Sequence, residues 1–122
     1  MEYSPEVERR LHSPEHVAGV AEPTGPVVMG EAEDRSLNVW VRFQVQLRGG
    51  AIGSVRFEAY GCPHFVAAAD WHAERLEGQP SAALAAPDTR AVRDALGVPI
   101  EKLGKLLVIE NALAACATAV AA

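Results

Sequence analysis

The stretch "AYGCPHF", residues 59–65, is the point at which one structural pattern stops and another begins. Before it, apolar and polar residues alternate with a period of two, which is typical of a strand with one buried face. After it, Pro63 suits the first turn of a helix, and apolar residues return at helical spacing as far as Gly78. The stretch therefore predicts a strand that leads directly into a helix, with Cys62 at the junction.

The alternating pattern also extends backwards along the chain. Apolar side chains occupy every second position from Leu37 to Leu47, and Gly49–Gly50 then supply the positive φ values that a tight turn needs. Residues 37–60 are thus predicted to form an antiparallel hairpin. The stretch "PVVMG" (residues 26–30) is predicted to add a short edge strand, because proline is tolerated at such positions.

Helix signals occur in the sequence both before and after the residues that are predicted to form this sheet. Ser4 can cap a short N-terminal helix, and Asp88 can cap another. A last helix is expected from about Pro99 to the C-terminus, with Cys116 on its apolar stripe. The predicted class is α+β, a small antiparallel three-stranded sheet with helices packed on one face, and residues 1–122 are expected to form a single domain.

The bulk composition excludes several classes of function. A net charge of −5 and a pI of about 5.3 disfavour attraction to nucleic acid or to an anionic membrane. The longest apolar run, "ALAACATAVAA", is shorter than the roughly 20 residues that a membrane span requires, and the first residues show no secretory pattern. Two cysteines make no disulfide framework, so we expect reduced thiols in a cytoplasmic protein. No P-loop, dinucleotide fingerprint or Ser-His-Asp ordering is present, so an independent enzyme is not expected.

The position of Cys62 leaves its role open. A thiol at a helix N-terminus feels the positive end of the helix dipole and unpaired N–H groups, both of which favour the thiolate. Cys62 could be a packing residue, a nucleophile, a sulfur carrier or a metal ligand. Cys116 and His72 lie on apolar stripes and are expected in the core, His72 with a hydrogen bond, whereas no cluster is expected around His12 or His16.

Three segments resemble the iron–sulfur cluster assembly scaffolds of the NifU/IscU type, in the order in which that family has them. The segment "YSPEVERRLHSPEHVAG" (3–19) resembles the family's N-terminal helix and the stretch that follows it. The segment "VRFEAYGCPHFVAAADW" (55–71) resembles its central strand, Tyr-Gly-Cys turn and alanine-rich helix. The segment "VPIEKLGKLLVIENAL" (98–113) resembles its Leu-Pro-Pro-Val-Lys-Leu-His-Cys stretch and the next helix. The resemblance covers nearly the whole chain and implies a NifU/IscU-like domain, a family that binds its cluster through three cysteines helped by an aspartate and a histidine.

The resemblance also implies that this chain retains one of the three ligand cysteines, Cys62. The family's first cysteine lies in an Ala-Cys-Gly-Asp turn, which matches residues 28–31, and "EAEDRSL" (31–37) then resembles an insertion. The third cysteine lies in a His-Cys pair, which matches Gly104 and Lys105. Neither a thioether nor an ammonium replaces a thiolate on iron, so cluster assembly on a monomer is expected to be impaired. The candidate auxiliary residues are Met29, Glu31, His64 and Lys105.

The partners and cargo follow from the same resemblance. Family scaffolds receive sulfur from a cysteine desulfurase, which implies a sulfur acceptor at Cys62 and a positive charge beside it from Lys105. An iron–sulfur cluster shared by two copies of the chain, as a homodimer, is one alternative. An adaptor or regulatory paralogue that docks on a cysteine desulfurase or another partner without binding metal is a second. A small zinc protein using Cys62, His64 and Glu31 is a third. Lys102 matches a lysine of the family's chaperone-recognition stretch and is expected to be solvated.

Overall fold

The computed structural model describes residues 3–12, 16 and 25–121. Between α1 and β1 the described residues are His16 and residues 25–26. The elements, in chain order, are α1 (Pro5–His12), β1 (Val27–Asp34), β2 (Val39–Arg48), β3 (Ala51–Tyr60), α2 (Pro63–Leu76), the 3₁₀ turn η1 (Ser81–Ala85), α3 (Thr89–Leu96), the 3₁₀ turn η2 (Ile100–Lys102) and α4 (Leu103–Ala121).

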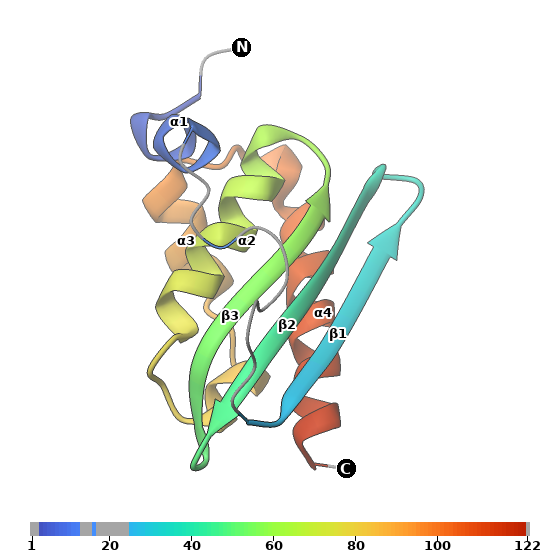
Figure 1. Cartoon of the computed structure of the whole chain (residues 1–122). Helices are drawn as coiled ribbons and strands as arrows, with labels where there is room; N and C mark the ends of the chain where they lie inside the picture. Colours follow the sequence, from blue (N-terminus) through green and yellow to red (C-terminus); the bar gives the residue numbers. More distant parts are fainter. Residues whose placement is uncertain (1–2, 13–15, 17–24, 122) are drawn as a thin grey trace.

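The three strands form one antiparallel sheet in the order β1-β2-β3 (Figure 1). The predicted hairpin is confirmed, since β2 and β3 pair along their length and meet at Gly49 and Gly50, whose φ values are +58° and +80°. The predicted edge strand is also present, but it is longer than expected. Residues 31–34 continue β1 in register with β2 and are not an inserted loop.

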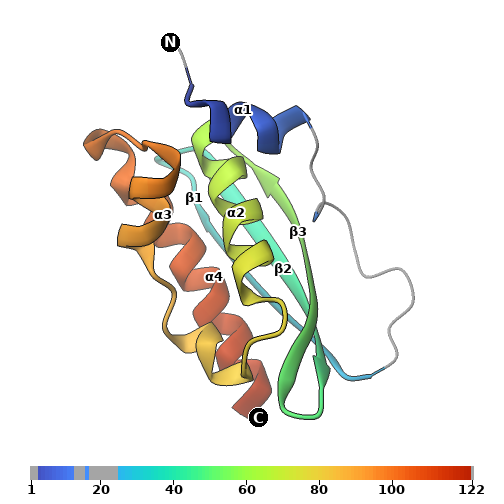
Figure 2. The same cartoon turned by 90° about the vertical axis from the view of Figure 1, so that its left-hand side faces the viewer.

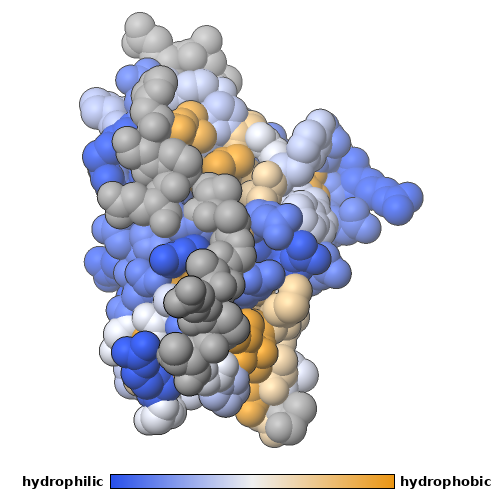
Figure 3. Space-filling view, in the orientation of Figure 1, coloured by the Kyte–Doolittle hydropathy of each residue, from blue (hydrophilic) through white to orange (hydrophobic). Residues whose placement is uncertain are grey.

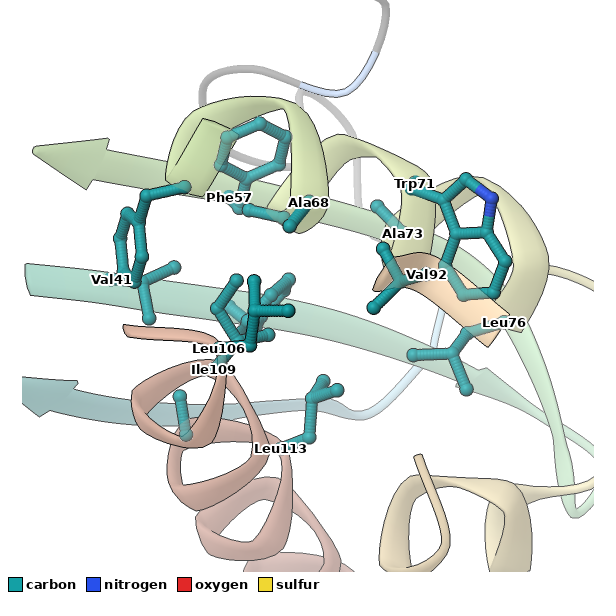
Figure 4. Packing of buried hydrophobic residues seen from close by; sticks show 14 of the residues in the cluster. Val41, Phe57, Ala68, Trp71, Ala73, Leu76, Val92, Leu106, Ile109 and Leu113 are labelled. Atoms are coloured by element: carbon teal, nitrogen blue, oxygen red, sulfur yellow. The ribbon is translucent and has the colours of Figure 1, made fainter. Parts of the chain in front are cut away.

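The helices pack on one face of this sheet, which confirms the predicted α+β class. In the side view α2, α3 and α4 all lie on the same side of the strands (Figure 2). α2 covers β3, while α4 crosses β1 and β2. Figure 4 shows how the layers meet, with Val41 and Phe57 from the strands facing Ala68 of α2 and Ile109 of α4.

Among the residues that the structure describes, no helix lies on the opposite face of the sheet, and the coloured surface of this face is mainly hydrophilic (Figure 3). Charged pairs span the strands on this face, such as Arg42 Nη2 and Glu58 Oε1 at 2.9 Å. Apolar side chains are exposed near the beginning of β1, where Val27 and Met29 are 37% and 47% exposed. The sheet is therefore a single layer, and its core lies entirely on the helix side.

Helix α4 approaches the edge strand very closely. A Cβ atom on Gly30 would lie 2.4 Å from the Ala112 carbonyl oxygen and 2.8 Å from Cys116 Sγ. Such a contact explains why small residues occupy the inner face of β1. An 18-residue window within Ile100–Ala121 has a mean hydropathy of 1.5, so by length and composition alone this segment could cross a membrane, although the apolar run was expected to be too short. Its Leu106 and Ile109 side chains are buried against the sheet, as in the core helix of a soluble protein.

Buried charges attach the N-terminal part of the chain to α2. Arg10 donates from Nη1 to Asp70 Oδ2 at 2.6 Å, and both side chains are about 5% exposed or less. His16 is also buried, with Nδ1 3.1 Å from Asp70 Oδ1 and Nε2 3.0 Å from Glu77 Oε1. The expectation that no cluster surrounds His16 is therefore wrong. Spacing along the chain did not reveal it, because Asp70 and Glu77 come from α2 and the residue that follows it.

Candidate functional site

Cys62 is the residue that joins β3 to α2. It is the N-cap of α2, with φ −71° and ψ 164°, and its carbonyl oxygen accepts hydrogen bonds from the N–H groups of Phe65 (2.9 Å) and Val66 (3.1 Å). The preceding residue, Gly61, lets the backbone pass close to the Phe65 ring, since a Cβ on Gly61 would lie 2.8 Å from that ring. The thiol is half-buried, so it is neither sealed in the core nor fully exposed.

Lys102 is the side chain whose charge lies closest to this thiol. It belongs to η2, just before α4, and its Nζ is 3.9 Å from Cys62 Sγ. The same Nζ lies 3.0 Å from Nδ1 of His64 and 5.6 Å from the centre of the Tyr3 ring. The Tyr3 ring in turn meets the His64 imidazole edge-on at 4.8 Å. The structure thus corrects the expectation of a solvated Lys102 and brings together four residues from three distant parts of the chain.

The electrostatics of the cluster favour a thiolate beside a neutral imidazole. Partial burial acts to raise the pKa of Cys62, but the Phe65 N–H, the positive charges of Lys102 and Lys105 and the His64 N–H together leave that pKa below its ordinary value. Burial, followed by the charges of Lys102 and Lys105, lowers the pKa of His64. His64 lies in the first turn of α2 but is only 3% exposed, so its ring is buried. The neutral ring can accept the hydrogen bond that the Lys102 ammonium donates to Nδ1.

Beside the thiol lies a hollow of about 420 Å³, which we call the Cys62 hollow. The residues that line it are Leu37, Asn38, Tyr60, Gly61, Cys62 and Lys105. Lys105 is therefore near Cys62, as the resemblance implied. The participation of Leu37 and Asn38 was not predicted, because they come from the turn between β1 and β2 and no pattern in the sequence links them to Cys62.

Met29 and Glu31 do not join this hollow. Both lie within β1, where Glu31 pairs with Arg42 across the strands, and they line a separate hollow with Arg42. The Glu31 carboxylate accepts a hydrogen bond from Trp40 Nε1 at 3.0 Å. The turn that reaches Cys62 is formed by residues 35–38, whereas residues 28–31, which were matched to the family's ligand-bearing turn, lie within β1. Since β1 continues to Asp34, the turn comes later in the chain than the apolar pattern indicated.

The two remaining core candidates lie away from the hollow. Cys116 is fully buried, its Sγ lies 4.0 Å from the Phe43 carbonyl oxygen, and burial raises the pKa of its thiol to about 12. His72 is buried as expected, and burial lowers its pKa to about 4. However, its Nε2 finds no hydrogen-bond partner among the described residues, which differs from the expected hydrogen-bonded side chain.

The residues of the Cys62 hollow do not fit an iron–sulfur cluster. Such clusters are held mainly by thiolates, and the whole chain has only two cysteines, of which Cys116 is buried elsewhere. Across the part of the chain that the structure describes, no group of three or more His, Cys, Asp or Glu side chains could hold a metal ion. The zinc set of Cys62, His64 and Glu31 is not assembled, because Glu31 lies on the outer face of the sheet and His64 Nδ1 already contacts Lys102.

The fold and the thiol at the strand–helix junction are those of a NifU-type domain, and comparison with known proteins agrees. The model of the family "NifU-like N terminal domain" matches residues 2–121, so this chain belongs to that family. The bifunctional protein NifU/MnmA of Rubrobacter xylanophilus is 32% identical over 99 residues, which are 80% of this chain but 20% of that protein. The chain therefore spans about a fifth of the length of this relative.

Two crystal structures have the same fold. One is described as an iron–sulfur cluster assembly scaffold protein for the SUF system from Fervidobacterium islandicum, with a TM-score of 0.70, 15% identity, and coverage of 94% of this chain and 96% of that one. The other is the N-terminal part of a nitrogen-fixing NifU-like protein from Brucella abortus, with a TM-score of 0.65, 18% identity, and coverage of 93% and 90%. At these identities the likeness shows the fold alone.

Proposed function

We propose that this protein takes part in iron–sulfur cluster assembly by accepting sulfur on Cys62. The observation that carries the proposal is the placement of this thiol, half-buried at the start of α2, with Lys102 Nζ 3.9 Å from Sγ and the Cys62 hollow beside it. A thiol with a lowered pKa and access to solvent is the form that reacts with sulfur donors. Membership in the NifU-like family supports the biological setting.

The reaction is a transfer between two cysteines. The Cys62 thiolate attacks the outer sulfur of a persulfide carried by the donor, a new S–S bond forms on Cys62, and the donor's S–S bond breaks. The donor cysteine leaves as a thiolate and takes up a proton, while Cys62 becomes the persulfide. No net oxidation occurs, so no further oxidant or reductant is required.

A cysteine desulfurase is the donor that this proposal names, because such an enzyme makes a cysteine persulfide. The chain itself is then a carrier of sulfur and not an enzyme in its own right. Both of its cysteines are free, which agrees with a reducing, cytoplasmic setting. An iron–sulfur cluster would be cargo of this protein. Its assembly would need thiolates from another protein or from another copy of this chain.

Mass spectrometry tests the proposal directly. The purified chain is incubated anaerobically with a cysteine desulfurase and cysteine, and we expect its mass to increase by one sulfur atom, located on the peptide that contains Cys62. The Cys116→Ala variant should gain the same mass, whereas the Cys62→Ser variant should gain none. A chain that forms a complex with the desulfurase but gains no sulfur would instead be an adaptor, and the proposal would be wrong. Visible absorbance after anaerobic reconstitution with iron and sulfide, lost in Cys62→Ser, would show cluster binding.

A further inference from the structure

We infer that the Cys62 hollow excludes metal cations and is built to receive an anion, because two ammonium groups occupy the positions from which a metal would be held. This inference deepens the proposed function. The identity of the anion as a persulfide rests on that function, whereas the exclusion of metal does not. The two can therefore be tested separately.

Lys102 occupies the place where a metal ion would bridge Cys62 and His64. A zinc-like ion must lie about 2.3 Å from a thiolate sulfur and about 2.0 Å from an imidazole nitrogen. Lys102 Nζ already contacts both of these atoms, at 3.9 Å from Sγ and 3.0 Å from Nδ1. The ammonium has no lone pair to offer, and it uses the lone pair of Nδ1 that a metal would need. A cation could enter only by displacing this group.

Other contacts hold the Lys102 ammonium at this position. Its Nζ lies 5.6 Å from the centre of the Tyr3 ring, within the range of a cation–π interaction. The backbone is also fixed, because the Lys102 N–H donates to the Pro99 carbonyl oxygen at 3.0 Å in η2. Displacement of the ammonium would therefore also lose its contact with the Tyr3 ring.

The remainder of the Cys62 hollow offers a metal no compensating negative charge. Lys105 adds a second ammonium, and the turn between β1 and β2 contributes a hydrocarbon from Leu37 and a neutral carboxamide from Asn38. The acid at the start of this turn, Asp34, is engaged with the backbone: its Oδ1 accepts hydrogen bonds from the N–H groups of Ser36 (2.9 Å) and Leu37 (3.2 Å). No carboxylate is thus among the described residues that line the hollow.

The same charges suit a persulfide. The outer sulfur of a Cys62 persulfide would lie about 2.05 Å beyond Sγ, on a side chain that borders an open hollow. An outer sulfur with a negative charge would be stabilised by the ammonium groups of Lys102 and Lys105. The charge arrangement that repels a divalent cation is therefore the one that retains sulfur in anionic form.

A cobalt titration tests the inference, because thiolate-to-cobalt absorbance reports Cys62 coordination directly. We compare wild type with the double variant Lys102→Met/Lys105→Met, which removes both charges but keeps side chains of similar length. Removal of two repelling charges should tighten Co²⁺ binding at Cys62 at least about tenfold. Protection of Cys62 from alkylation by Co²⁺ provides a second readout. Far-ultraviolet circular dichroism checks that the variant is folded.

The matched control is the variant Lys102→Arg/Lys105→Arg, which keeps both charges and should bind Co²⁺ no better than wild type. The inference is overturned if wild type and the methionine variant have equal affinity, including the case in which neither binds, because the lysines would then not be the cause of exclusion. Wild type that binds Co²⁺ tightly and still accepts sulfur from a desulfurase would overturn metal exclusion while leaving the proposed function intact.

Discussion

The two cysteines of this chain have the same side chain but differ in position, in burial and in the groups that surround the thiol. Cys62 begins a helix, is half-buried and lies beside Lys102, whereas Cys116 lies within α4 and is sealed against β1 and β2. Burial acts in the same direction on both thiols, since it disfavours the thiolate. For Cys62 the N–H groups at the start of α2 and two lysines outweigh that effect, while Cys116 has no such neighbours to oppose its burial.

The comparison leads us to expect that the strand–helix junction makes Cys62 the more reactive of the two thiols. A helix start leaves backbone N–H groups without partners within the helix, and those groups point toward the N-cap side chain. In the middle of α4 every N–H group is used by the helix itself, so a cysteine there behaves as a small apolar residue. We therefore expect the position of a cysteine along a helix to decide how readily its thiol ionises.

The largest effect that follows from this comparison is a difference in alkylation rate. At pH 7 we expect iodoacetamide to modify Cys62 at least about a thousand times faster than Cys116. A pKa of about 12 leaves Cys116 roughly a thousandth of the thiolate of an ordinary thiol, and its sulfur is inaccessible in the folded state. Peptide mass spectrometry of timed samples measures both rates in one experiment. In concentrated guanidinium chloride the rates should converge, and similar rates in the native protein would contradict the comparison.

The two thiols should also give opposite dependences of stability on pH. In the unfolded state the Cys116 thiol ionises near pH 9, whereas in the folded state it stays protonated up to about pH 12. The free energy of unfolding therefore decreases as pH rises between those values. The loss amounts to about 4 kcal/mol over the whole window and about 2 kcal/mol by pH 10.5, at about 1.4 kcal/mol per pH unit. Urea unfolding of wild type and of Cys116→Ala at several pH values measures it, because the variant should lack this part of the slope.

Cys62→Ala is the matched control for that experiment. The folded pKa of Cys62 lies below its unfolded value, so Cys62 contributes stability that increases as pH rises through the folded pKa toward the unfolded one. Relative to Cys62→Ala, wild type should therefore become more stable with rising pH below pH 9. Slopes of the same sign for both cysteines would mean that burial dominates at both positions.

Local sequence patterns predicted the elements whose buried residues repeat regularly. The alternation in β2 and β3, the glycine pair at their turn and the proline after Cys62 each act within a few residues, so the hairpin and α2 could be predicted from the sequence alone. The length of β1 could not be predicted. Beyond Val28 its inner face continues with Gly30 and Ala32, which are too small to give an apolar pattern, and α4 approaches Gly30 closely.

The candidate site was predictable only at its centre. Cys62 stands out in the sequence, and the resemblance to NifU/IscU scaffolds led to Lys105. The contact of Lys102 with Cys62 joins residues 40 positions apart, and Leu37 and Asn38 reach the hollow through a turn that was predicted too early in the chain. Such contacts depend on how the sheet and helices pack together, which no short stretch of sequence encodes.

A substitution at Gly30 would test whether close contact with β1 is what isolates Cys116. A Cβ atom there would lie 2.4 Å from the Ala112 carbonyl oxygen and 2.6 Å from the Cys116 nitrogen, and backbone atoms cannot move aside as a flexible side chain can. We expect Gly30→Ala to lower the free energy of unfolding by about 2 to 3 kcal/mol and to speed alkylation of Cys116 without changing that of Cys62. Gly53→Ala is the control, because a Cβ on Gly53 would meet its nearest neighbour at 3.4 Å, and it should cost far less stability. If Gly30→Ala left both the free energy of unfolding and the rate of Cys116 alkylation unchanged, α4 would be free to shift away from β1. The isolation of Cys116 would then have to come from the depth of the core rather than from this contact.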